Sequence, residues 1–145
     1  MRDLPRQLTA DELAELFEGR TRLVEKLADR EDPLRSAHDV IRALTDEEKL
    51  EALNAHPAIG ARKLSARSAA EQGTDDAVET LAELDRLNRE YEERFGFRFV
   101  VFVNRRTKSE LVPILRERLG RSREEELNTA VHELVAIAED RWRRS

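Results

Sequence analysis

The sequence predicts an all-α protein, a single-domain multi-helix bundle with one short extended apolar segment at about residues 97–103. Three observations support this prediction. Five S/T-x-x-E patterns typical of helix starts are spread along the 145 residues. Apolar residues recur at helical spacing in two long stretches. No repeat, low-complexity tract or linker interrupts the chain, so residues 1–145 are expected to form one domain with a real core.

Four helices are expected in the N-terminal half, over residues 9–17, 21–29, 33–44 and from 45 to the turn before residue 56. Gly19 is a suitable stop for the first helix. Pro33 suits the first turn of the third helix, where its missing N–H costs nothing. The fourth helix must end near Asn54 or Ala55, because the residue that precedes a proline is driven out of the α region.

Two apolar stripes define long helices in the C-terminal half, over residues 75–94 and 123–143. The first stripe comprises Val78, Leu81, Leu84, Leu87, Tyr91 and Phe95, and the second comprises Leu127, Val131, Leu134, Val135, Ala138 and Trp142. Gly96 is a stop for the first of these helices. Between the two, Thr107 opens another helix, in which Pro113 lies near the first turn or causes a kink.

The run FGFRFVVFV, residues 95–103, breaks the helical pattern because it is dense in β-forming apolar residues. No second strong strand is available to pair with it. Its backbone N–H and C=O groups must therefore find other hydrogen-bond partners. Helix ends, side chains or water could satisfy these groups. Alternatively, some of them could line a pocket and bind an amide-like ligand.

The composition argues against several classes of function. Charged residues make up 39% of the chain, but the net charge of −5 and the pI near 5.4 argue against a nucleic-acid binder. The absence of cysteine excludes disulfides, thiolate nucleophiles and Cys-ligated metals, and three scattered histidines make a tight transition-metal site improbable. No apolar run approaches the roughly 20 residues that span a bilayer. We expect a cytoplasmic protein with no nucleic-acid or membrane partner and no metal.

The stretch ALNAHPAIGAR places His56 directly before Pro57, just beyond the expected end of a helix. The helix dipole at that end favours the imidazolium form, and with it a proton donor near neutral pH. Pro57 and Gly60 restrict the backbone and hold the imidazole in a stiff turn. A capping or surface role is the alternative. His38 and His132 lie inside helical patterns without such turn signals.

A second candidate constellation is SAAEQ, residues 68–72. Ser68 and Glu71 form a capping box, which is a sufficient structural explanation of both residues. Gln72, however, adds a long amide next to the box. A hydroxyl, a carboxylate and an amide at one helix start could together bind a polar, nitrogen-rich small molecule.

The order of the motifs resembles one family. His56-Pro57 with Ile59-Gly60, then Ser68-x-x-Glu71-Gln72, then Leu87-Asn88-x-x-Tyr91-x-x-Arg94-Phe95-Gly96-Phe97-x-Phe99-Val100 are similar to the motifs of the 2-oxo-4-hydroxy-4-carboxy-5-ureidoimidazoline (OHCU) decarboxylases of urate degradation. The resemblance runs from about Leu13 to Trp142. It implies an all-α fold, usually a homodimer, and a decarboxylation of OHCU to (S)-allantoin that uses no cofactor.

The resemblance also implies roles for single residues. His56 matches the proton donor, and Glu71 would accept hydrogen bonds from the hydroxyl or ureido group of the substrate. The substrate-binding positions are matched by Pro57, Ser68, Ala69, Ala70, Glu71 and Gln72, and by the backbone of Phe99, Val100, Val101, Phe102 and Val103. The family often has proline at the position of Arg98 and arginine at that of Asn104, whereas here Arg105 and Arg106 follow. Which cation meets the substrate carboxylate is therefore open.

Two alternatives remain at this point. Because Arg98 and Asn104 lie in or beside the expected substrate-binding stretch, the chain could act on another ureido or carboxylated heterocycle. The other alternative is a non-catalytic helical interaction module whose stripe from Val78 to Phe95 covers a partner helix. That module would leave the stripe partly exposed in the isolated chain, and it would not explain the ordered motifs.

Overall fold

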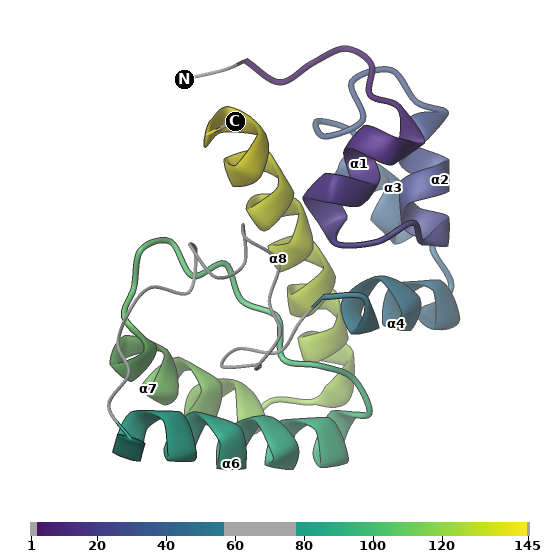
Figure 1. Ribbon diagram of the computed structural model, residues 1–145. Coiled ribbons are helices and arrows are strands. Elements are labelled where there is room, and N and C mark those ends of the chain that lie inside the picture. Colours follow the sequence, from purple (N-terminus) through teal and green to yellow (C-terminus); the bar gives the residue numbers. More distant parts are fainter. Residues whose placement is uncertain (1–2, 57–77, 145) are drawn as a thin grey trace.

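The computed structural model describes residues 3–56 and 78–144, which form seven α-helices and no strand, as the sequence predicts (Figure 1). The helices are α1 (Ala10–Phe17), α2 (Arg22–Ala28), α3 (Ala37–Arg42), α4 (Asp46–Asn54), α6 (Val78–Phe95), α7 (Lys108–Leu119) and α8 (Arg123–Arg144). The long helix α8 contacts α1, α3 and α4, while α6 packs against α7. No helix in the described ranges is long and apolar enough to cross a membrane.

The helix starts follow the capping chemistry that the sequence predicts. At Thr9, Thr45 and Thr107 the hydroxyl accepts the N–H three residues on, and the glutamate at that position accepts the N–H of the threonine. Ser122 makes the same reciprocal pair with Glu125 at the start of α8. Each box satisfies two N–H groups that lack helical partners. The fifth pattern, at Ser68, lies outside the described residues.

The expected helix over residues 33–44 is shorter than predicted, because α3 begins only at Ala37. Asp32 adopts a left-handed conformation with φ 49°. The carbonyl of Asp32 then accepts both the N–H and the hydroxyl of Ser36, at 2.9 and 3.0 Å. These bonds close a turn over residues 32–36, so Pro33 lies in that turn and not in the first turn of a helix.

Gly19 ends α1 in a different way from the one predicted. The left-handed residue is Glu18, with φ 65°, and the N–H of Gly19 donates to Ala14 O at 3.0 Å. A Cβ at position 19 would lie 3.3 Å from the Cβ of Ala55, closer than ordinary van der Waals contact. Glycine therefore allows the close approach of this turn to the residue that caps α4, where a larger residue would require a small shift.

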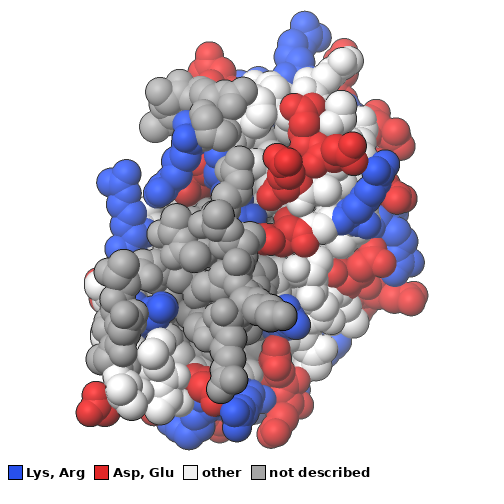
Figure 2. Space-filling model, viewed as in Figure 1, with Lys and Arg blue, Asp and Glu red and all other residues white. Residues whose placement is uncertain are grey.

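The apolar stripe of α6 is buried over most of its length. Leu84, Leu87, Tyr91 and Phe95 are buried, whereas Val78 at the start of the helix is 78% exposed. The stripe of α8 is buried as well, from Leu127 to Ala138. The partial exposure that an interaction module requires is thus confined to the first turns of α6. Both signs of charge are interspersed over the face shown in Figure 2.

The structure shows where Pro113 lies in its helix and where the last helix ends. Pro113 lies inside α7, beyond its first turn, and the helix continues to Leu119. The last helix extends to Arg144, one residue further than expected, and Trp142 donates its indole N–H to the carbonyl of Asp3 at 2.7 Å. That bond fixes the N-terminal segment beside the end of α8.

The segment over residues 97–103, predicted to be extended, carries neither helix nor strand and connects α6 to α7; it is called the extended segment below. Gly96 starts it with φ 80°, a conformation that favours glycine. Asn104 and Arg105 end it with φ 48° and 64°, both left-handed. For an L-residue this conformation costs on the order of 1–2 kcal/mol. Phe97 and Phe99 are 2% exposed and meet the ring of Tyr91 edge-on, with centroids 5.9 and 5.3 Å apart.

Candidate functional site

His56 lies just past the end of α4, where the sequence places it. Ala55 caps the helix, and the N–H of His56 donates to Leu53 O at 3.2 Å. The residue is buried, with 7% of its surface exposed, and its Nδ1 has no hydrogen-bond partner among residues 3–56 and 78–144. A buried polar atom without a partner is costly, and such atoms are found where a ligand can supply the missing bond.

The sequence leaves open whether the helix end raises the pKa of His56 or burial lowers it, and the structure favours the second. The pKa of His56 is lowered from 6.5 to about 4, mainly by burial and then by the cations of Arg141 and Arg98. The carboxylate of Glu18 acts in the opposite direction but does not compensate. Desolvation therefore outweighs the helix dipole, and the imidazole is neutral at pH 7.

Arg141 on α8 and Glu18 at the end of α1 form a fixed pair of charges near this histidine. Arg141 is 1% exposed; it donates to Leu16 O at 2.9 Å and meets the carboxylate of Glu18 at 3.1 Å. Neither residue is predicted from the sequence to belong to the site. The available signal was periodicity, because Arg141 follows Leu134 and Ala138 on the buried face of α8.

Arg98 connects the extended segment to the histidine turn. Its guanidinium donates to the carbonyl of His56 at 2.6 Å and lies 3.8 Å from the carboxylate of Glu92. Arg98 stands where the resembled family often has proline. In this chain its side chain is thus used to hold two segments together that are 42 residues apart in the sequence.

A buried polar network supports the middle of the extended segment. Arg118 donates to Val100 O and to the carboxylate of Glu126, both at 2.7 Å, and the hydroxyl of Tyr91 donates to the same carboxylate oxygen at 2.6 Å. The Arg118 guanidinium also lies 4.6 Å from the ring centroid of Phe99. Burial raises the pKa of Tyr91, and the bond to Glu126 raises it further, so the phenol remains a donor.

Other side chains occupy the far end of the segment. Arg106 donates to the carbonyls of Phe102 and Val103, and Glu133 accepts the N–H of Phe102 at 3.4 Å. Part of this backbone is thus satisfied by side chains. Within the described residues, no hydrogen bond reaches the N–H of Phe99 or Val101.

The contacts of this stretch do not exclude the predicted role in substrate binding. A carbonyl oxygen carries two lone pairs, so a bond from a side chain leaves room for a ligand. The predicted role of residues 99–103 therefore stays a prediction. The remaining predicted site residues, Pro57, Ser68, Ala69, Ala70, Glu71 and Gln72, lie outside the described residues.

The other two histidines are close together, on different helices. The rings of His38 on α3 and His132 on α8 stack with centroids 4.6 Å apart, and their Nδ1 atoms face each other. Burial lowers the pKa of His132, and the nearby His38, Arg42 and Lys49 lower it further. The described part of the chain holds no group of three or more side chains that could bind a metal ion.

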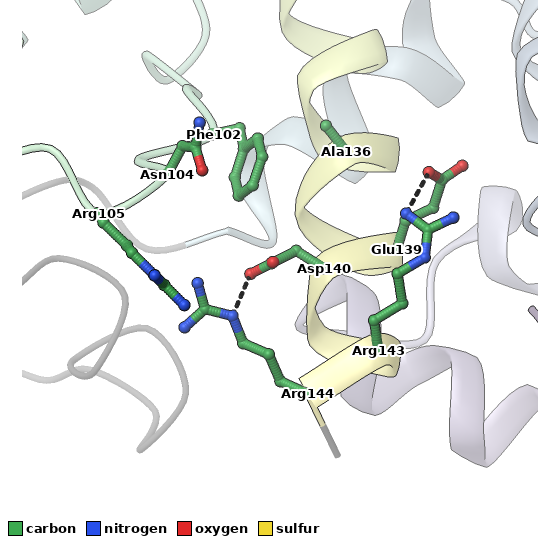
Figure 3. A pocket seen from close by; sticks show the side chains of 8 residues that line it. All are labelled: Phe102, Asn104, Arg105, Ala136, Glu139, Asp140, Arg143 and Arg144. Atoms are coloured by element: carbon green, nitrogen blue, oxygen red, sulfur yellow. Dashed lines mark ion pairs between the residues drawn. The ribbon is translucent and has the colours of Figure 1, made fainter. Parts of the chain in front are cut away.

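A cleft of about 550 Å³ lies between the end of the extended segment and the C-terminal half of α8 (Figure 3). Phe102 and Arg105 line it from the segment. Glu139, Asp140, Arg143 and Arg144 line it from α8. The cleft therefore adjoins the stretch that we expect to bind substrate.

Comparison with known proteins assigns the chain to a family. The model of the OHCU decarboxylase family matches residues 2–143. An OHCU decarboxylase of Haloferax volcanii is 36% identical over 117 residues, which are 74% of this chain and 68% of that protein. The uric acid degradation bifunctional protein of Bacillus subtilis is 27% identical over 143 residues, 91% of this chain but only 29% of its own length.

Solved structures share the fold. A crystal structure of an OHCU decarboxylase in the presence of (S)-allantoin superimposes with a TM-score of 0.75 and 26% identity, covering 90% of this chain and 94% of that one. A crystal structure of an (S)-allantoin synthase gives a TM-score of 0.67 at 24% identity, covering 91% of this chain and 47% of that one, and it supports the fold alone.

Proposed function

Because this chain belongs to the OHCU decarboxylase family, we propose that it converts OHCU to (S)-allantoin and CO2, as a carboxy-lyase that needs no cofactor. The observation that supports this most is His56, a buried imidazole whose Nδ1 has no partner in the part of the chain that the structure describes, and whose carbonyl is bonded by Arg98 of the extended segment. A ligand that fills the space beside His56 would supply the missing hydrogen bond.

The chemistry needs orientation and one proton. When the C–CO2 bond breaks, its electron pair passes into the adjoining C=N π system and leaves an enol. The enol hydroxyl then loses its proton to become a carbonyl, and the neighbouring carbon, which bears the ureido group, takes up a proton on one face. The site must hold that bond in line with the π system and deliver the proton from a fixed direction. No metal or pyridoxal is needed for this step, because the ring itself delocalises the charge.

His56 is the proposed proton carrier. It is neutral at pH 7 in the free protein, so it can first accept or polarise the proton of the substrate hydroxyl group. The carboxylate of a bound substrate would raise the pKa of His56 again, because an anion stabilises the imidazolium. The imidazole would then return this proton to the neighbouring carbon that bears the ureido group, while the carbon that has lost CO2 becomes the carbonyl carbon of allantoin.

The other proposed roles fall to two segments. Glu71 would accept hydrogen bonds from the hydroxyl or ureido group, and Gln72 would orient the ureido arm. The N–H groups of Phe99 and Val101, which have no partner in the described part of the chain, would receive the carbonyl edges of the ring. We also propose that the protein is a homodimer in the cytoplasm, and sedimentation of the purified chain tests the dimer.

The test uses the chirality of the product. OHCU is generated in situ from urate by the two upstream enzymes, the protein is added, and circular dichroism follows the appearance of allantoin. We expect a fast rise of the (S) signal. Formation of racemic allantoin at the rate seen in buffer alone would refute the proposed activity.

Matched histidine variants then test the proton carrier. His56→Gln should lower kcat by roughly a hundredfold or more, as expected for loss of a general acid–base. His38→Gln removes an exposed histidine on α3 and should keep the wild-type rate. A His56→Gln enzyme with wild-type kcat would end the assignment, whatever the activity of the chain.

An alternative substrate is favoured by one observation. The Arg98 side chain is engaged by the His56 carbonyl, and Asn104 stands where the family often has arginine. A site altered at both places could prefer another ureido or carboxylated heterocycle. Turnover of such compounds by the wild type and by Arg98→Pro, compared with OHCU, separates the two substrates.

A further inference from the structure

The cleft beside the extended segment has an uneven distribution of charge. Among the described residues that line it are three arginines and two carboxylates. Arg144 lies 2.9 Å from Asp140, and Arg143 lies 3.7 Å from Glu139, so each carboxylate already has a cation on its own helix. Arg105 makes no ion pair with any described residue. The described residues of the cleft therefore carry one uncompensated positive charge, on Arg105.

The arginines from the two sides of the cleft converge. Figure 3 shows the Arg105 side chain extending from the segment toward the Asp140–Arg144 pair on α8. Asp140 neutralises Arg144, so the positive charge that remains among the described residues at this place is that of Arg105. The geometry thus favours a negatively charged group in the space between Arg105 and Arg144.

The backbone holds Arg105 in this position at a conformational cost. Asn104 and Arg105 are consecutive left-handed residues, with φ 48° and 64°. The next residue, Arg106, donates to the carbonyls of Phe102 and Val103 and so fixes the turn. Strained non-glycine residues persist where the surrounding structure requires them, and they are frequent at ligand sites. A glycine would adopt this left-handed conformation without strain. The chain instead has an arginine there, and its cationic side chain lines the cleft.

We propose that this cleft binds a carboxylate, with Arg105 as the cation that receives it. The planar guanidinium matches the two oxygens of a carboxylate. Phe102 offers an apolar wall for the body of the ligand, and about 550 Å³ accommodates a small heterocyclic acid. Asp140 and Glu139 stand beside the arginines and repel a group of higher charge, so a singly charged carboxylate fits better than a phosphate.

The carboxylate has two possible sources. It can be the carboxylate of the decarboxylation substrate, which Arg105 would orient before CO2 leaves, and this identification rests on the proposed function. It can instead belong to a separate small acid. Binding to the cleft requires neither assumption, so it can be measured even if the chain does not decarboxylate OHCU.

The test measures binding of three small probes by calorimetry and by chemical-shift changes at low salt. The probes are imidazole-4-carboxylate, its uncharged counterpart imidazole-4-carboxamide, and inorganic phosphate. We expect only the carboxylate to bind clearly, and we expect Arg105→Gln to weaken its affinity by roughly five- to tenfold. Arg105→Lys, which keeps the charge and loses the planar fork, should lie in between.

The matched control is Arg89→Gln. It removes the same charge from an exposed arginine on α6, which pairs with Asp85 at 2.8 Å, and it should leave the affinity unchanged. Equal binding of the carboxamide, equal weakening by Arg89→Gln, no effect of Arg105→Gln, or no binding by the wild type would each overturn the proposal.

The two sources are separated by turnover. Competitive inhibition of OHCU decarboxylation by imidazole-4-carboxylate, together with a raised KM for Arg105→Gln, identifies the substrate carboxylate. Arg105-dependent binding without any effect on turnover identifies a separate acid. Both results support the carboxylate cleft, and a chain without decarboxylase activity that still binds the probe would refute only the proposed function.

Discussion

Acidification should weaken the fold through His56. The pKa of this imidazole is lowered from 6.5 to about 4, first by burial and then by Arg141. The folded state therefore resists protonation that the unfolded chain accepts. The stability contributed by neutral His56 is complete above pH 6.5, and it is lost as the pH falls from 6.5 through 4.

The size of the effect follows from the two pKa values. A difference between a pKa of 6.5 in the unfolded chain and one of about 4 in the folded state corresponds to roughly 3 kcal/mol of unfolding free energy. The loss is complete only well below pH 4, where both states are protonated. That is a large part of the total stability of a domain of this size. Aspartates and glutamates also titrate in this range, so the wild-type curve alone does not isolate the histidine.

The assay is urea unfolding from pH 8 to pH 4, followed by circular dichroism, for the wild type, His56→Gln and His38→Gln. The difference between the wild type and His56→Gln cancels the carboxylates that they share. We expect the wild type to lose up to about 3 kcal/mol more than His56→Gln over this range, and His38→Gln to follow the wild type. Parallel curves, or an NMR titration of His56 with its midpoint near 6.5, would refute the reasoning from burial.

Three further substitutions have defined outcomes in denaturant unfolding. Glu126→Gln leaves the Arg118 guanidinium buried without its counter-charge and should cost about 3–5 kcal/mol; a loss under 1 kcal/mol would contradict the network. Gly96→Ala should cost only about 1 kcal/mol, because φ is 80° but nothing lies within 4 Å of the new Cβ; a larger loss would indicate a clash. Arg105→Gly should gain about 1 kcal/mol by relieving the left-handed strain while weakening carboxylate binding, and a loss of stability would contradict that account.

Local chemistry explains what could be predicted from the sequence. The capping boxes at Thr9, Thr45 and Thr107 depend on residues three apart, and all three formed as predicted. The end of α4 before His56 follows from a single proline. The α3 start was misplaced because a turn closed by Asp32 and Ser36 competes with the helix over the same residues.

The electrostatics of the site could not be predicted in the same way. The neutral state of His56 depends on burial and on Arg141, which is 85 positions away in the sequence and reaches this region only after α8 packs on α1. The role of Arg98 was missed for a related reason, since its partner is a backbone carbonyl that carries no sequence signal. Long-range packing decides both.

The close approach of Gly19 to Ala55 has a consequence for how variation can alter this protein. A methyl group at position 19 would lie 3.3 Å from the Cβ of Ala55, so Ala55 would have to shift by a few tenths of an ångström. The residue that would be displaced immediately precedes His56. Reaction rates depend steeply on the placement of such groups. A substitution in the turn after α1 can thus change the turnover rate without contacting any ligand, and selection can act on this enzyme through a residue that does not line the described cleft.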